Sequence, residues 1–468
     1  VLCLACFAAC GSGSSDNTTS SAPADSSSEA DSSAPAADGA AFKIGSTGPL
    51  TGDAAIYGKA VMNAAQIAVD EINAEGKIKF EFKGEDDVAD GETAVNAYNK
   101  LMDWGMQILM GPVTTGAAIA VSAKSYEDRV FSLTPSGSST DIIDGKDNFF
   151  QVCFTDPNQG TGSADYMAEN MKDAKIAVIY RNDDAYSQGI FNTFEKEAKA
   201  KGLKLVYTGT FTKDTATDFS VQLTAAKAAG ADTVFLPIYY QPASVILKQA
   251  NGMDYNPTFF GVDGMDGILT MKGFDTKLAE GVMLLTPFSA DADDAKTQAF
   301  VKKYQEKYGD TPNQFAADAY DGIYIIADAL QKAGCTPDMS AADICEKLIE
   351  VMPTLSFDGL TGEGMTWSKT GEVSKAPRAV VIKDGVYVTP SIYNFQLNLK
   401  RPAVRASCSA VGFRFCFEVS ENRPQVRSFV KFTAIVFRDL KKRYYRKQKS
   451  RKKLTIKTRC IKWNFFHM

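Results

Sequence analysis

A repeating alternation of short β-type runs and longer helical runs extends along this chain from residue 42. The helical runs repeat apolar residues at spacings of three and four, as Val61, Ala64, Ala65 and Ala68 do. The order strand–helix–strand predicts parallel sheets with helices on both faces. The predicted strands are 42–45, 78–82, 107–110, 130–133, 149–154, 175–180, 204–207, 233–236, 258–261 and 378–382. The predicted helices are 56–74, 188–201, 219–229, 294–308, 316–333 and 341–351.

These runs form two series, one reaching residue 154 and one beginning at residue 175. Two series of similar size predict an α/β fold of two doubly wound, Rossmann-like lobes. Helical runs follow the second series before the last strand, so we expect the chain to cross between the lobes more than once. A length of 468 residues, 45% hydrophobic and 23% charged, suits two globular cores with appendages.

The loops after the predicted strands differ between the two series. Ligands of open α/β sheets bind beyond the carboxyl ends of the strands, which makes these loops the candidate site. In the first series, the loops 47–52, 111–116 and 134–139 are rich in hydroxyls and glycine and lead towards helices, which suits a carboxylate. In the second series, 183–186 and 261–264 supply acids and aromatic residues. Together the two lobes match a zwitterionic amino acid.

The order of motifs resembles the branched-chain amino acid (Leu/Ile/Val) type of ABC transporter substrate-binding protein, a type I periplasmic binding protein family. The resemblance covers about residues 42–390. It rests on the segments IGSTGPLTGDAAIYG, GPVTTG, LTPSGSS, FTDPNQG, YRNDDAYSQG, LPIYYQP, FFGVDG and ADAYDGIY. It implies two lobes joined by a multi-strand hinge, with 42–155 plus 287–376 forming lobe 1 and 156–286 plus 377–395 forming lobe 2.

The resemblance also implies a set of ligand-binding residues. Thr115 takes the position of a carboxylate-binding hydroxyl, Gly137 offers backbone groups, and Ser138 offers a hydroxyl. Asp263 falls on the acidic position that pairs with the ligand ammonium, one methylene shorter than the glutamate often found there. The residues that match the family's cleft aromatics are Tyr57, Tyr186 and Tyr239.

Simpler roles for these residues stay open. Thr115 and Ser138 could be N-caps of the helices that follow them. Asp263, directly before a glycine, could be a turn residue. The three tyrosines could be packing residues.

The resemblance implies a binding protein that closes on an amino acid, branched-chain or related, and delivers it to a permease driven by ATPase subunits. A ligand-sensing module of the same fold, acting on a receptor partner, is the alternative. No cofactor, metal or nucleic acid is expected. The only histidine is His467, so no His-based triad or His-bound metal is available to the body of the chain, which argues against an enzyme.

The N-terminal segment indicates export. The apolar run 1–9 is too short to span a bilayer, and small residues before Cys10 resemble a bacterial lipobox. We expect residues 1–10 to be a truncated lipoprotein signal ending at an acylated Cys10, and 11–41 to be a disordered tether. The protein would then be extracytoplasmic and lipid-anchored to the outer face of the bacterial membrane. An incidental Cys10 after an apolar leader is the alternative.

Residues 396–468 differ in charge from the rest of the chain. They carry 20 Lys/Arg and 3 Asp/Glu, whereas the remaining residues carry 31 and 53. This tail is expected to be disordered, or a read-through or assembly artefact. Binding to anionic lipid, cell-wall polymer or nucleic acid through charge is the alternative.

Two cysteines in the body of the chain also leave two interpretations open. Cys335 and Cys345 could form a disulfide, which an oxidising surface would permit, or they could be two unpaired small core residues.

Overall fold

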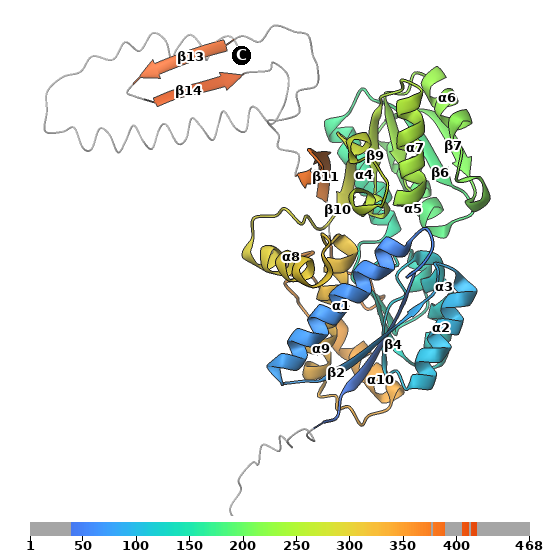
Figure 1. The fold of residues 1–468 in the computed structure, drawn as a ribbon, viewed down its shortest axis with the longest axis vertical. Helices are drawn as coiled ribbons and strands as arrows, with labels where there is room; N and C mark the ends of the chain where they lie inside the picture. The colour runs from blue at the N-terminus through green and yellow to red at the C-terminus, as the bar shows by residue number, and fades with distance from the viewer. Residues whose placement is uncertain (1–38, 376–377, 389–404, 411–412, 419–468) are drawn as a thin grey trace, which may run out of the picture. The chain divides into compact units, whose positions relative to one another are not determined.

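The computed structural model describes residues 39–375, 378–388, 405–410 and 413–418. The chain divides into two compact units, Val1–Pro390 and Ser391–Met468. The first unit contains two sheets flanked by helices, which we call the first and second lobes (Figure 1). The second unit contains a two-stranded hairpin. No helix in the described ranges is long and apolar enough to cross a membrane.

The sheet of the first lobe is parallel throughout and has the strand order β2-β1-β3-β4-β5. Ile44 in β1 is aligned with Phe82 of β2 on one side and Ile108 of β3 on the other. Every residue of β3 and β4, the next two strands in the sheet, is buried, as expected when helices cover both faces of a sheet. The strands are β1 (Phe42–Gly48), β2 (Phe80–Asp86), β3 (Ile108–Met110), β4 (Phe131–Thr134) and β5 (Phe149–Gln151).

The sheet of the second lobe has the order β12-β11-β10-β9-β8-β6-β7. Its strands pair in parallel from β7 to β10, and β11 and β12 join antiparallel at one edge. The strands are β6 (Lys175–Arg181), β7 (Lys204–Phe211), β8 (Thr233–Leu236), β9 (Thr258–Gly261), β10 (Met283–Thr286), β11 (Arg378–Lys383) and β12 (Val386–Val388).

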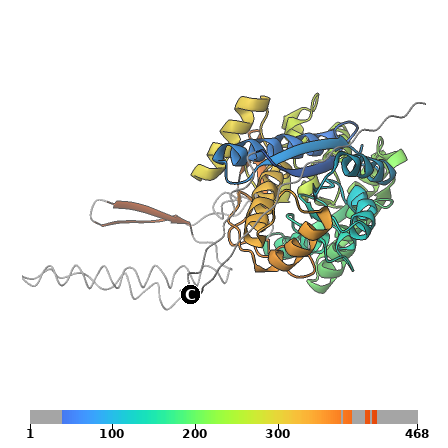
Figure 2. The same ribbon diagram turned by 90° about the horizontal axis from the view of Figure 1, so that it is seen from below.

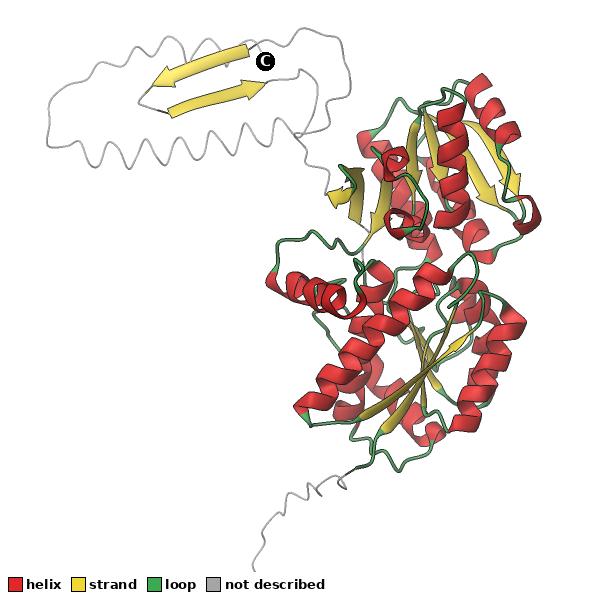
Figure 3. Ribbon diagram, in the orientation of Figure 1, coloured by secondary structure: helices red, strands yellow, loops and turns green. Residues whose placement is uncertain are grey.

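Helices flank both sheets (Figure 3). In the first lobe, α1 packs against α9 and α8; the view from below shows the blue α1 beside the yellow α8 (Figure 2). In the second lobe, α4 and α5 pack closely together. The helices of the first lobe are α1 (Ala55–Glu75), α2 (Gly91–Trp104), α3 (Thr115–Glu127), α8 (Ala295–Tyr308), α9 (Gln314–Ala333) and α10 (Ala341–Val351). Those of the second are α4 (Asp156–Asn170), α5 (Ala185–Ala200), α6 (Ser220–Ala228) and α7 (Tyr240–Gly252).

Local sequence explains where several helices begin and end. The Asp90 carboxylate accepts a hydrogen bond from the backbone N–H of Thr93 and so caps α2, which ends at Gly105 with φ of 88°. In the same way Asp294 caps α8 through Thr297, and Gly309 ends that helix in the left-handed region. Glycine tolerates this conformation because it has no Cβ.

The predicted strand bounds are wrong by two residues or more at β1, β2, β5 and β7, and β10 was not predicted. The Asn73 side chain bonds both the N–H and the C=O of Phe80, so β2 begins at Phe80 and not at residue 78. The last strand of the first sheet ends at Gln151, because the chain then leaves this sheet and starts α4 at Asp156.

Two strands of the tail lie among the described residues. These strands, β13 (Arg405–Ala410) and β14 (Phe413–Glu418), pair antiparallel with Arg405 opposite Glu418. The aromatic run of β14 favours a strand. The remainder of the tail lies outside the described residues, and so do Cys10 and the tether up to residue 38.

The chain passes between the two sheets three times. It leaves the first sheet after β5, returns after β10, and leaves again before β11. Near the third passage, the ammonium of Lys375 donates to the carboxylate of Asp318 at 2.7 Å and to the Thr361 hydroxyl at 2.6 Å, and all three residues are buried. This buried ion pair ties the passing chain to α9.

Candidate functional site

A small cavity lies where residues of the two lobes meet. Its lining combines side chains from the first lobe with side chains from the second. The open space between them is about 10 Å³, roughly the room that one water molecule needs. A larger ligand therefore enters only when the lobes separate or the lining side chains turn away. The lining residues are Tyr57, Val113, Thr114, Ser136 and Phe315 of the first lobe and Tyr186, Tyr239, Asp263 and Gly264 of the second.

Asp263 is the acidic group of this cavity. It follows β9 in a short 3-10 helix, Asp263–Met265, and is 3% exposed. The Tyr186 hydroxyl donates to its carboxylate at 2.5 Å, and its own N–H donates to the Gln159 side-chain oxygen at 3.2 Å. Burial raises the pKa of Asp263 to about 7, although the hydrogen bond from Tyr186 favours the charged form. The side chain bonds a tyrosine of the cavity lining, while the backbone of Asp263 also forms a turn in which its carbonyl accepts from the Asp266 N–H at 2.9 Å.

The tyrosines Tyr186 and Tyr239 pack together beside this carboxyl group. Asp184 caps α5 and places Tyr186 in the first turn of that helix, while Tyr239 directly precedes α7. Their ring centroids are 4.8 Å apart. Burial raises the pKa of both phenols well above the ordinary value, so both keep their protons and can donate hydrogen bonds.

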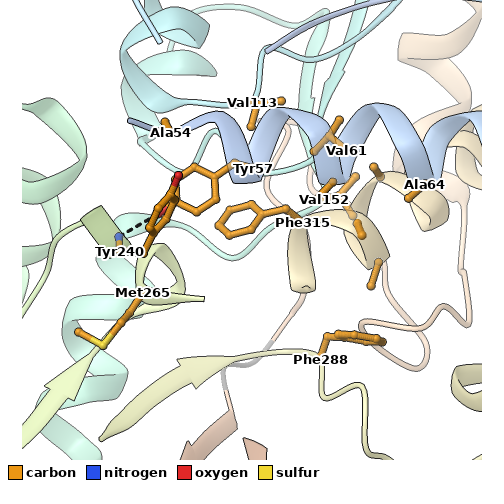
Figure 4. Close-up of a cluster of buried hydrophobic side chains, with 14 of the residues drawn as sticks. Ala54, Tyr57, Val61, Ala64, Val113, Val152, Tyr240, Met265, Phe288 and Phe315 are labelled. Atoms are coloured by element: carbon orange, nitrogen blue, oxygen red, sulfur yellow. Dashed lines mark hydrogen bonds between the residues drawn. The ribbon is translucent and has the colours of Figure 1, made fainter. Parts of the chain in front are cut away.

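Tyr57 connects the two lobes directly. It projects from the first turns of α1, and its hydroxyl donates to the Gly264 carbonyl and accepts from the Tyr240 N–H at 3.2 Å. Figure 4 shows its ring beside Phe315, with centroids 4.3 Å apart, and turned towards Tyr240. A buried side chain of one lobe thus bonds the backbone of the other.

The remaining predicted residues, Thr115, Gly137 and Ser138, lie together in the first lobe. The Ser138 N–H donates to the Thr115 hydroxyl at 3.2 Å, and the two side-chain oxygens are 3.5 Å apart. The Gly137 N–H donates to Thr134 at 2.7 Å, and its carbonyl accepts from Gln151 at 2.9 Å. The backbone groups of Gly137 are therefore already engaged within the lobe.

The N-cap alternative for these residues is wrong. Thr115 is the first residue inside α3, and the N-cap is Thr114. Ser139, not Ser138, caps the short 3-10 helix Thr140–Ile142. The side chains of Thr115 and Ser138 are buried and do not line the cavity. The nearby residues Thr114 and Ser136 line it instead.

Sequence reasoning missed several residues of the site. Thr114 and Ser136 are adjacent to predicted residues, so the loop pattern located them within one or two positions. Phe315 lies in α9, where the pattern indicates only a helix. Gln159, which accepts from the Asp263 N–H, lies in α4, five residues after the predicted strand 149–154.

Comparison with known proteins identifies the family of the chain. A family model described as periplasmic binding protein matches residues 41–386. The chain belongs to the periplasmic binding protein family. This confirms the resemblance and the α/β fold that the sequence predicts. The family is one of solute-binding proteins and not of enzymes.

This periplasmic binding protein is similar to several characterised chains. It is 30% identical to the Leu/Ile/Val-binding protein homolog 3 of Brucella melitensis, over 71% of this chain and 88% of that one. It is 28% identical to LivJ, the branched-chain amino acid transporter substrate-binding protein of Streptococcus pneumoniae, solved with isoleucine. The TM-score is 0.67, and the match covers 74% of this chain and 97% of LivJ.

A third protein shows the same fold with a different ligand. It is a solute-binding protein of an R. palustris ABC transporter, solved with benzoate. It is 22% identical to this chain, with a TM-score of 0.67, and the match covers 75% of this chain and 96% of that one.

The disulfide considered for this binding protein does not form. Cys335 and Cys345 are both free thiols. Cys345 is fully buried on the inner face of α10, and burial raises the pKa of its thiol to about 12. Cys335 follows the end of α9 and packs partly buried against the same core. The two are thus the separate core residues of the other interpretation.

Proposed function

We propose that this protein captures an amino acid, branched-chain or related, in the cavity between its lobes and delivers it to an ABC-type importer. One observation carries the proposal. Asp263 and Tyr186 of the second lobe line the same small cavity as hydroxyl-bearing residues of the first lobe. An amino acid carries an anionic and a cationic group a few bonds apart, and this cavity offers a partner for each.

The first lobe supplies the partner for the carboxylate. The N-cap of α3, Thr114, makes no side-chain capping bond, so the first turn of this helix keeps N–H groups that can receive an anion. The hydroxyls of Thr115 and Ser138 lie beside this turn. A ligand carboxylate placed there would accept hydrogen bonds from both the backbone and the side chains.

The second lobe supplies the partner for the ammonium. Asp263 is an acceptor, and Tyr186 fixes its orientation. Next to it, the rings of Tyr57, Tyr239 and Phe315 offer an apolar wall for the ligand side chain. The similarity to LivJ, which was solved with isoleucine, supports an apolar ligand side chain.

Delivery follows from closure. A ligand that contacts both lobes stabilises the closed form, in which Tyr57 bonds the second lobe, and so shifts the population towards it. The permease would accept this closed form. We also propose that acylated Cys10, outside the described residues, anchors the protein to the membrane. The intact mass of the mature protein tests the anchor, since acyl chains on Cys10 add a defined mass.

A thermal-shift screen of the common L-amino acids, followed by calorimetry, tests the function. We expect a subset of amino acids to raise the melting temperature, because ligands that bind only the native state stabilise it. Asp263→Ala should weaken binding about 10–100-fold, the usual effect of removing a hydrogen bond to a charged group. Asp173→Ala, on the exposed surface of the same lobe, is the matched control. No response to any amino acid, or equal affinity in the Asp263 variant, would contradict the proposal.

A further inference from the structure

The first turn of α4 carries an acidic side chain with an unusual environment. Asp156 is 1% exposed, and neither of its carboxylate oxygens has a hydrogen-bond partner among the residues that the structure describes. Burial raises the pKa of Asp156 well above the ordinary value; the nearby Ser138 side chain opposes this shift, and the charge of Asp263 adds to it. A buried carboxyl group without hydrogen-bond partners lowers the free energy of unfolding, so a role in binding would account for Asp156 at this position.

Asp156 lies at the boundary between the two lobes. Its N–H donates to the Ser138 carbonyl at 2.8 Å, which joins it to the hydroxyl loop of the first lobe. On the other side of Asp156, a Cβ atom at Gly189 of α5 would lie 3.0 Å from Asp156 Oδ2. Because glycine has no side chain, the carboxyl group of Asp156 has room at this position.

The same face of α4 reaches Asp263. Gln159, one turn after Asp156, accepts from the Asp263 N–H at 3.2 Å through its side-chain oxygen. Its side-chain NH₂ group has no partner within the described ranges. The first turn of α4 thus brings unpaired polar atoms next to the acid that lines the cavity.

We propose that Asp156 is a second acidic contact for the ligand's cationic nitrogen, beside Asp263. This inference rests on the proposed function. An ammonium group has three N–H donors, and it can bond both carboxylates while it neutralises part of their charge. Two buried carboxylates also oppose the entry of ligands that carry only negative charge. The pair would therefore select amino acids over acids such as benzoate, which the R. palustris protein binds.

Calorimetry of Asp156→Asn tests this inference, with three probes: L-isoleucine, its α-hydroxy acid analogue and benzoate. We expect Asp156→Asn to weaken isoleucine binding at least about tenfold. The ratio of the isoleucine affinity to the hydroxy acid affinity should fall by a similar factor, because only isoleucine has an ammonium group to contact the Asp156 carboxylate. Asp165→Asn is the control, since Asp165 lies on the same helix and pairs with Lys201 at the surface. It should bind isoleucine like the wild type.

Thermal unfolding without ligand separates a binding role from a structural one. If Asp156 serves binding alone, Asp156→Asn removes a buried carboxyl group that has no hydrogen-bond partner, and the variant should melt at the same or a higher temperature than the wild type. A lower melting temperature, failure to fold, or unchanged isoleucine affinity would overturn the inference. If the wild type binds none of the common amino acids, the proposed function fails as well, which is a distinguishable result.

Discussion

At the scale of single residues, burial sets the chemistry of this site. Asp263 lies in an apolar wall of tyrosines, and its carboxyl group has a raised pKa of about 7 even though Tyr186 donates to it. Near neutral pH the group is therefore close to its own titration point. A cationic ligand would favour the charged form, so binding and deprotonation of Asp263 are expected to be coupled.

The pH dependence of stability tests this description of Asp263. An aspartate with a folded pKa above its unfolded value binds more protons when folded. The protonated Asp263 therefore contributes fully to the free energy of unfolding below about pH 4, and this contribution is lost as the pH rises to about 7. Asp263→Asn cannot ionise, so its unfolding free energy without ligand should exceed that of the wild type at pH 7 by on the order of 2–4 kcal/mol. Urea unfolding between pH 4 and pH 8 measures both proteins, and parallel curves would contradict the assignment.

Tyr57 allows a separate test of closure. Tyr57→Phe keeps the ring but leaves the Tyr240 N–H and the Gly264 carbonyl without this partner in the closed form. We expect amino acid affinity to fall about 5–30-fold, mainly through faster dissociation, because unsatisfied buried groups cost about 1–2 kcal/mol. Stopped-flow measurement of the dissociation rate checks this. Tyr126→Phe, on the exposed end of α3, is the matched control. An unchanged dissociation rate for Tyr57→Phe would show that this contact does not hold the closed form together.

The sequence predicted residues of the site where a loop follows a strand. Asp263, Tyr186 and Tyr239 lie within a few residues after a strand, and all three line the cavity. Phe315 could not be found in this way, and Asp156, although it follows the predicted strand 149–154, was not singled out. Their positions depend on how α9 and α4 pack against distant parts of the chain, and periodicity carries no information about that packing.

At the scale of elements, strand and helix types follow from apolar periodicity, while their ends depend on specific contacts. The predicted helix 341–351 matches α10, which Ser340 caps through Asp343. The predicted start of β2 was wrong by two residues, because the side chain of Asn73 fixes Phe80 as its first residue. Such a side-chain contact is invisible in the hydrophobic pattern.

The close packing of α4 on α5 allows a test at the scale of elements. A Cβ atom at Gly160 would lie 2.1 Å from the Thr193 hydroxyl and 2.5 Å from the Ile190 carbonyl oxygen. Gly160→Ala should therefore destabilise the protein by at least about 2 kcal/mol, despite the better helix propensity of alanine. Gly252→Ala in α7 meets nothing within 4 Å and should be neutral or stabilise by up to about 1 kcal/mol. Chemical unfolding compares the two, and equal effects would contradict the described packing.

At the scale of the whole molecule, the chain passes between the two sheets three times. The sequence predicted repeated crossing from the order of its runs, whereas the exact bounds of the two lobes stay a prediction. It could not predict the buried Lys375–Asp318 pair, because the two residues are distant in the chain. Nor could it predict the contact of Tyr57 with the second lobe, since that contact depends on how the two lobes pack together.

A crystal structure with an amino acid identified by the thermal-shift screen tests the central claim most directly. The account predicts a single ligand between the lobes, with its ammonium in contact with Asp263 and its carboxylate at the first turn of α3 near Thr115 and Ser138. A ligand bound to one lobe alone, or at a site away from this cavity, would contradict it.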